Sequence, residues 1–210
     1  MNKLHKTILA ILLLMAATGC GKEKYVKPMS DAAYATADCA CGVFRLVSID
    51  WTGEPVDLDG DGVAQESLLE ECLAGKHSGM SAYDRVVEWT VQPLYSYSET
   101  PILELFPFFH GDFTPGVESS AYYSLNLIFG KMRVFEDGTL DVTMYDYQRV
   151  IDGQVMNEEG AVRDITVTLE PDGDFLVAGT TCFRDERTGE TVRGRATHRY
   201  HCVSTKEKKK

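Results

Sequence analysis

Three aspartates in one short stretch are the residues of this chain whose types and spacing best suit chemistry. Asp57, Asp59 and Asp61 occupy alternating positions, and Gly62 follows directly. Carboxylates at this spacing can turn inward around a hard divalent cation, because a glycine lets the backbone turn sharply after the third acid. The stretch therefore predicts a calcium site. No cofactor is expected to be required, and calcium is the one ion that the sequence suggests.

The aspartate stretch resembles the first half of the calcium loop in EF-hand and dockerin domains. Its second half departs from that pattern. The twelfth position counted from Asp57 is Leu68, where the family has a bidentate acid, and Glu66 and Glu70 are the nearest carboxylates. A second interpretation needs no metal: the loop forms Asx turns and caps a helix that starts near Ala64. The sequence leaves both interpretations open.

Motifs of catalysis are missing from the sequence. It contains no G-x-S-x-G, no H-E-x-x-H, no glycine-rich phosphate loop and no dinucleotide fingerprint. Among 32 acidic residues, a pair of carboxylates at glycosidase spacing is expected by chance and indicates nothing. We therefore expect that the protein is not an enzyme and has no catalytic residues.

The first twenty residues have the layout of an export signal. Lys3 and Lys6 precede an apolar run over residues 7–16, which is too short to span a bilayer, and Ala17-Thr18-Gly19-Cys20 follows. This layout resembles the lipobox of bacterial lipoproteins, although Ala17 stands where leucine is usual. The resemblance implies cleavage before Cys20, lipidation of its thiol, and attachment to the outer membrane. The periplasmic or cell-surface orientation stays open.

The charge of the chain bears on its partners. The 21 basic and 32 acidic residues give a net charge of −11, and loss of Lys3 and Lys6 with the signal would leave 19 basic residues and a charge of −13. An acidic surface of this kind repels nucleic acid and anionic lipid. We expect no nucleic-acid partner, and membrane contact only through acyl chains on Cys20.

Five further cysteines would meet an oxidising compartment behind such a signal, where disulfides are favoured over metal thiolates. They are Cys39, Cys41, Cys72, Cys182 and Cys202. We expect Cys72 to pair with either Cys39 or Cys41, and Cys182 to pair with Cys202, which leaves one cysteine over. The alternative is a zinc site on Cys39, Cys41 and either His198 or His201, but no C-x-x-C or H-x-x-x-H spacing supports it.

Hydrophobic alternation predicts an all-β domain. A first strand is expected over 42–51, a short helix over 65–73, and hairpin turns at 136–138, 152–153, 171–174 and 188–189. About eight antiparallel strands and one helix predict an up-and-down barrel, with a β-sandwich as the alternative. The expected organisation is a signal peptide (1–19), a flexible lipidated tether (20–38), the barrel (39–204) and a disordered basic tail (205–210).

The N-terminal part of the predicted barrel carries a family resemblance. GVFRLVSIDW at 42–51 and VDLDGDGVAQESLLEEC at 56–72 resemble, in that order, the opening segment of small lipocalin-like lipoproteins of Bacteroidetes. The resemblance covers about Gly42 to Cys72. It implies a lipocalin-like barrel on an outer-membrane lipoprotein.

Three pairs of aromatic residues at i, i+2 spacing each place two rings on one face of a strand, where they would fill the barrel or line a small cavity. The pairs are Tyr95 and Tyr97, Phe106 and Phe108, and Tyr145 and Tyr147. The first functional hypothesis is a non-enzymatic lipid-anchored barrel that binds a small apolar or amphipathic ligand at these rings. The alternative is a structural or accessory interaction module of an outer-membrane complex without a ligand cavity, whose protein partner the sequence does not identify.

Overall fold

The computed structural model describes residues 29–74, 86–91, 102–111, 123–148, 150–151, 154–155 and 161–204. The expectation of an all-β, antiparallel domain is confirmed for these residues, which contain two short helices besides the strands. Neither helix of the described part is long and apolar enough to cross a membrane. The predicted signal, Cys20, Tyr95 and Tyr97 lie outside the described residues.

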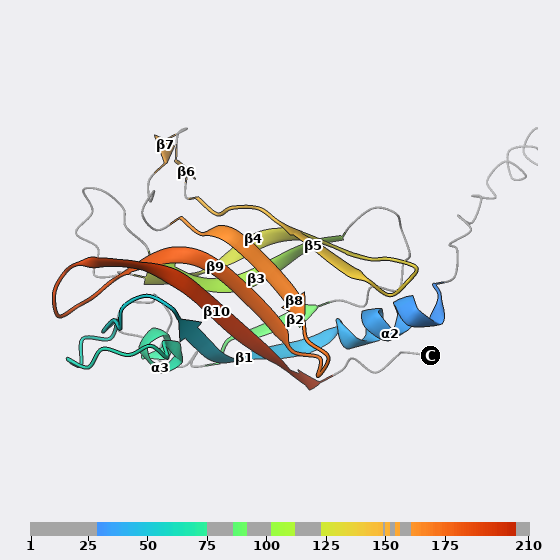
Figure 1. Ribbon diagram of the computed structural model, residues 1–210, viewed down its shortest axis with the longest axis horizontal. Coiled ribbons are helices and arrows are strands. Elements are labelled where there is room, and N and C mark those ends of the chain that lie inside the picture. The colour runs from blue at the N-terminus through green and yellow to red at the C-terminus, as the bar shows by residue number, and fades with distance from the viewer. Residues whose placement is uncertain are drawn as a thin grey trace, which may run out of the picture.

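The largest sheet has five antiparallel strands in the order β2-β1-β10-β9-β8 and curls into a half-barrel (Figure 1). Its strands are β1 (Gly42–Trp51), β2 (Glu88–Val91), β8 (Arg163–Leu169), β9 (Phe175–Arg184) and β10 (Thr191–Ser204). β1 pairs with β10, so the first and last strands of the domain lie side by side. The predicted first strand is confirmed with its expected bounds.

A second sheet packs against the half-barrel. It has the order β3-β4-β5 and consists of β3 (Ile102–Gly111), β4 (Tyr123–Val134) and β5 (Leu140–Met144). An isolated bridge between Tyr147 and Val162 joins the chain after β5 to the chain before β8. A small hairpin, β6 (Val150–Ile151) with β7 (Gln154–Val155), stands apart from both sheets. The structure thus shows a half-barrel and a second sheet.

The core between the two sheets is aromatic. The Trp89 ring lies 4.8–5.8 Å from the rings of Phe106, Phe175 and Tyr200, and Phe44 contacts both Trp89 and Phe175. All five side chains are buried. Rings at these separations and tilts add attraction beyond the area that they remove from water. Aromatic packing therefore holds the second sheet on the half-barrel.

Three of the predicted hairpin turns are confirmed, and a glycine carries each one. Gly138, Gly173 and Gly189 have φ angles of +86°, +89° and +71°. Residues with a Cβ rarely adopt this left-handed conformation, so glycine at these points sets where the chain reverses. The turns join β4 to β5, β8 to β9 and β9 to β10.

The predicted flexible tether is wrong for its second half, where the structure has the helix α2 (Asp31–Cys39). The side chain of Ser30 caps the helix by accepting from the N–H of Ala33. Ala33 and Ala37 are completely buried, and the Thr36 hydroxyl donates a 2.6 Å hydrogen bond to the carbonyl of Gly138. The ordered domain therefore includes residues 29–38, because small alanine side chains let the helix sit close on the sheets.

Candidate functional site

The aspartate loop lies at the opposite end of β1 from α2, next to the short helix α3 (Leu69–Leu73) (Figure 1). Two backbone hydrogen bonds between Val56 and Gln65, of 3.1 and 2.9 Å, close the base of the loop. The loop between Val56 and Gln65 is therefore short, and its two ends are held together by hydrogen bonds. This arrangement limits how far its carboxylates can move apart.

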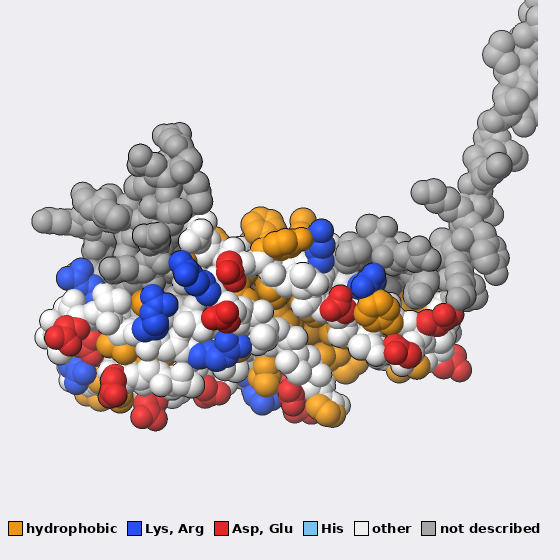
Figure 2. Space-filling view, turned by 45° about the horizontal axis from the view of Figure 1, so that its top comes forward, with side chains coloured by type: hydrophobic (Ala, Val, Ile, Leu, Met, Phe, Trp, Pro, Cys, Tyr) orange, Lys and Arg blue, Asp and Glu red, His pale blue; other side chains and the backbone are white. Residues whose placement is uncertain are grey.

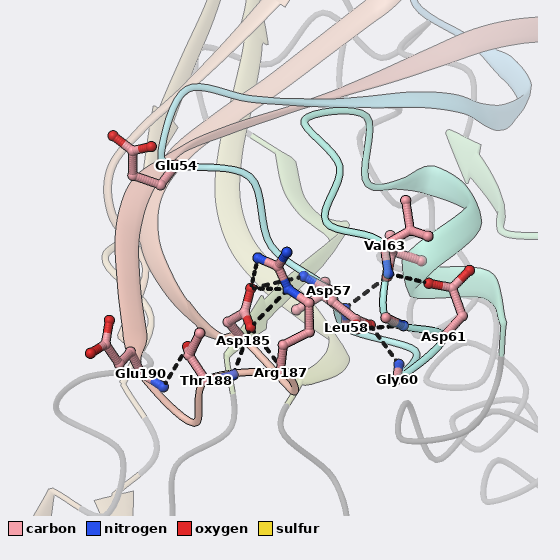
Figure 3. A network of polar contacts seen from close by, with 12 residues as sticks. Glu54, Asp57, Leu58, Gly60, Asp61, Val63, Asp185, Arg187, Thr188 and Glu190 are labelled. Carbon is pink, nitrogen blue, oxygen red and sulfur yellow. Dashed lines mark hydrogen bonds and ion pairs between the residues drawn. The ribbon is translucent and has the colours of Figure 1, made fainter.

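The loop's own backbone amides hold all three carboxylates inward. Asp57 accepts from the N–H groups of Gly60 and Gly62 at 2.6 and 2.8 Å, and Asp61 accepts from Val63 at 2.7 Å (Figure 3). Asp59 accepts from the N–H of Asp61 at 2.9 Å. Gly60 and Gly62 both have positive φ angles, so the loop bends around the side chain of Asp57. These are successive Asx turns, as one interpretation of the sequence predicts.

The three aspartates can each offer an oxygen atom to a common cation. Their candidate ligand atoms all lie within 4.8 Å of one another, and burial falls from Asp57, which is inaccessible to water, to Asp61, which is exposed. Calcium takes six to eight oxygen ligands at about 2.3–2.6 Å. Three carboxylates would supply part of this set, and backbone carbonyls and water would complete it from the exposed side. The arrangement suits a hard cation that binds and leaves through solvent.

Glu71 on α3 is a functional residue that the sequence reasoning missed. One oxygen of its carboxylate accepts from the N–H groups of Leu58 and Asp59, at 2.7 and 3.1 Å. The side chain is 1% exposed, and its other oxygen, Oε1, is buried without a hydrogen bond from the described residues. Burial raises the pKa of Glu71, and the neighbouring carboxylates of Asp59 and Asp57 raise it further. A cation in the loop would relieve this buried negative charge.

The turn between β9 and β10 contacts the aspartate loop at Asp57. Asp185, 2% exposed, accepts from the N–H of Asp57 at 3.3 Å (Figure 3). The N–H of Glu186 donates to the Asp57 carbonyl at 2.8 Å. Arg187 forms a 2.9 Å ion pair with Asp185 and lowers the pKa of that carboxyl to about 2. The loop is thereby fixed to a turn that lies 128 residues further along the chain.

The metal-free interpretation of the aspartates is wrong in its second part, because none of them caps a helix. Helix α3 begins at Leu69, and its N-cap residue, Leu68, makes no side-chain capping bond. Residues 66–68 instead pair with the end of β1, since the N–H of Leu68 donates to Ile49 and the N–H of Trp51 donates to Glu66. This pairing uses the backbone groups that the predicted earlier start of the helix would need.

The acids expected to complete the calcium ligands do not join the aspartates. Glu66 and Glu70 are exposed, and neither belongs to the cluster of Asp57, Asp59 and Asp61. Within the described ranges this cluster is the one group of three or more His, Cys, Asp or Glu side chains that could share an ion. The zinc alternative on Cys39, Cys41 and either His198 or His201 is therefore not formed.

The histidines named in that alternative have separate partners. His198 is fully buried, and its Nε2 accepts from the N–H of Phe109 at 3.0 Å. Burial lowers the pKa of His198 to about 3, so this side chain is neutral. His201 is exposed and contacts Asp174 at 2.7 Å. His198 is thus a neutral residue of the core, and its Nδ1 is buried without a hydrogen bond from the described residues.

The predicted ligand-binding aromatics do not form one site. Phe106 and Phe108 are completely buried and pack against Trp89 and His198, so they fill the core. Tyr145 is 46% exposed, with the Lys131 ammonium 5.7 Å from its ring centre. Tyr147 contacts His110 at 4.8 Å. One pair of aromatic residues thus lies in the core and Tyr145 lies on the surface, because tertiary packing decides which strand faces are buried.

A groove lies elsewhere, between α2 and the edges of β5 and β8. Its volume is about 470 Å³. The lining is mixed, and its apolar members are Ala35, Leu140, Val167, Leu169 and Pro171, with Cys39 at the end of α2. This volume falls in the range of small-molecule pockets. The groove was not predicted, because its walls come from three segments distant in sequence.

The predicted disulfide pairings are wrong in this structure. Cys72 lies on α3, which follows the residues that pair with the end of β1 at Ile49, whereas Cys39 and Cys41 lie just before the start of β1 at Gly42, so roughly 20 Å of strand separates them. Cys182 stands opposite Arg193 in the pairing of β9 with β10, and Cys202 lies nine residues further along β10. At about 3.3 Å per residue this separation is roughly 30 Å, against the 4.4–6.8 Å that a disulfide spans.

Comparison of this chain with protein-family models, with curated proteins and with solved structures finds no significant match.

Proposed function

We propose that this chain is a non-enzymatic, lipid-anchored protein of the bacterial outer membrane whose lipocalin-like β domain binds calcium at the Asp57 loop. The observation that carries the calcium site is the convergence of three carboxylates to within 4.8 Å around a loop whose amides already orient them. The buried Oε1 of Glu71 beside them, which has no hydrogen bond from the described residues, supports a nearby positive charge. The anchor rests on Ala17-Thr18-Gly19-Cys20.

Thermal unfolding in calcium and in chelator tests the metal site. Millimolar calcium raises the melting temperature of the parent protein, because a ligand that binds only the folded state stabilises it. Asp59→Ala abolishes the rise. Asp50→Asn, which changes an exposed acid of β1 outside the cluster, keeps it. If the parent protein has the same melting curve in calcium and in chelator, the proposed calcium site is contradicted.

The domain's cargo in this proposal is a small apolar or amphipathic molecule held in the groove between α2, β5 and β8. The support is the volume of about 470 Å³ and the apolar side chains of Leu140, Val167 and Leu169 on its wall. Binding of 1-N-phenylnaphthylamine, followed by its fluorescence, tests this function. Saturable binding is lost in Val167→Arg and kept in Val47→Arg, a matched change at an exposed position of β1. The absence of binding to the parent protein contradicts the ligand function.

The alternative function is an accessory interaction module, and one surface favours it. Leu103, Leu127, Phe129 and Tyr145 lie on the outer face of the β3-β4-β5 sheet and are 46–59% exposed. Hydrophobic side chains reach the surface among charged ones in the view of Figure 2. Exposed apolar patches commonly mark protein contacts. A photo-crosslinker at Phe129 that captures one defined envelope protein, while the same group at exposed Arg193 captures none, supports this function.

A further inference from the structure

We propose that Cys39 and Cys202 form a disulfide that fastens helix α2 to the last strand of the domain. Neither the pairing nor the cross-link between these elements was predicted from the sequence. The bond would join the first helix after the proposed tether to β10. Its location in an oxidising compartment rests on the proposed lipid anchor, whereas the bond itself can be tested on purified protein.

The geometry that carries the pairing centres on Gly173. The register of β9 with β10 places Tyr200 opposite Phe175, and just beyond this pair His201, the neighbour of Cys202, contacts Asp174, the neighbour of Gly173, at 2.7 Å. A Cβ atom built on Gly173 would lie 3.4 Å from the Sγ atom of Cys39. The Cys39 sulfur thus lies beside Gly173, and the residue that follows Gly173 contacts the residue that precedes Cys202.

The orientation of Cys202 agrees with this placement. Cys202 stands opposite Phe44 in the pairing of β10 with β1, and facing residues of two paired strands point to the same side of the sheet. Phe44 is completely buried, and Cys202 packs against the core that contains it. After burial itself, the Cys202 thiol is the leading influence that raises the pKa of Cys39, ahead of Asp172 and Cys41. The two sulfurs therefore share one environment.

Cys41 is the natural competitor for Cys202, and the structure gives it another contact. Its thiol donates to the backbone carbonyl of Asp38 at 3.4 Å, and its side chain is buried. Cys39 is half-buried and lines the open groove beside α2. An oxidant in solution can therefore reach Cys39, whereas the fully buried thiol of Cys72 is inaccessible.

The chemistry is thiol–disulfide exchange. One thiolate of the pair attacks the disulfide of an external oxidant, either oxidised glutathione or a protein thiol–disulfide oxidoreductase, and forms a mixed disulfide. The thiolate of the second cysteine then attacks the mixed disulfide and displaces the oxidant's remaining thiol. Cys39 and Cys202 lose two electrons and two protons in total, and the oxidant's disulfide is reduced to two thiols.

Peptide mapping of the full mature chain tests the bond. Protein carrying Cys20→Ser, so that five cysteines remain, is treated with oxidised glutathione and digested without reduction. The expected product links the peptide that contains Cys39 to the peptide that contains Cys202. Because Cys41 lies on the same tryptic peptide as Cys39, the variants Cys39→Ser and Cys41→Ser are compared. The link is lost in the first and kept in the second.

Thermal melting supplies an independent readout. Reduction of the oxidised protein lowers its melting temperature by about 5–10 °C, the effect of one disulfide that closes a long loop in a domain of this size. The same treatment leaves the Cys39→Ser variant unchanged, and Cys72→Ser serves as a control that keeps the shift. Should Cys39→Ser fail to fold, Cys202→Ala takes its place. A link that uses Cys41 or Cys72, or no link after oxidation, overturns the pairing.

Discussion

The carboxylate of Glu71 accepts a 2.7 Å hydrogen bond from the backbone N–H of Leu58, which joins helix α3 directly to the aspartate loop. The same oxygen accepts from Asp59, so a single side chain holds two consecutive amides of the loop. The Glu71 side chain therefore holds the aspartate loop and helix α3 together. A cation in the loop would change the electrostatics of this helix, and a change in Glu71 would alter the loop.

The Glu71→Gln variant tests this coupling. The pKa of Glu71 is raised above its ordinary value of 4.5, so the folded state holds its proton more tightly than the unfolded state. The resulting stability is complete below pH 4.5 and is lost as the pH rises through the folded-state pKa. In chelator, denaturant titrations should show this loss in the parent and a weaker loss in Glu71→Gln. Calcium should reduce the parent's loss. Identical pH profiles for the two proteins would contradict the coupling.

The Asp185→Asn variant tests the contact between the β9–β10 turn and the loop. Asp185 accepts from Asp57 and Arg187, and its carboxyl pKa is lowered to about 2, so its contribution is present above pH 3.8 and is lost as the pH falls towards 2. Removing this buried charge should cost about 2 kcal/mol of unfolding free energy at pH 7. Urea unfolding measures the cost. Asp141→Asn, at a half-exposed ion pair with Arg133, should change it by less than about 0.5 kcal/mol.

The His198→Gln variant tests the neutral histidine of the core. Burial lowers the pKa of His198 from 6.5 to about 3. Between these two pH values the unfolded state binds a proton on this side chain and the folded state does not. Stability that depends on this group is complete above pH 6.5 and falls as the pH decreases towards 3. The expected loss between pH 6 and pH 4 is about 2.5 kcal/mol. His198→Gln should flatten this part of the pH profile, and an equally steep profile in both proteins would argue against a neutral His198.

The Cys20→Ser variant tests the anchor. The β domain should still fold, because its described helices, strands and core residues all follow Cys20 in the chain, and the protein should appear in the soluble periplasmic fraction. Two or more acyl chains hold a protein stably on a membrane, so their loss should release it fully. Metabolic labelling with a palmitate analogue measures the modification. Label that persists on Cys20→Ser would remove the lipobox interpretation.

Local interactions explain why parts of this fold could be predicted. The glycine turns at Gly138, Gly173 and Gly189 depend on backbone conformations that few other residues adopt, and the first strand depends on alternation within ten residues. The aspartate loop is equally local, since Asp57 bonds to Gly60 and Gly62 within the same short stretch. Each of these features is complete within its own segment, so its residues suffice to indicate it.

The features that could not be predicted depend on partners far away in the chain. Helix α2 has no long apolar stripe, and it is held because Ala33 and Ala37 fit against sheets built from later residues. Glu71 and Asp185 look like ordinary surface acids until folding brings them to the amides of Leu58 and Asp57. The cysteine pairings failed for the same reason, because strand register sets which sulfurs meet. The sequence by itself determined the turns, the first strand and the aspartate loop, since these need only neighbouring residues. The tertiary structure decided the burial of α2, the support of the loop and the neighbours of each thiol, because these arise only when distant segments pack together.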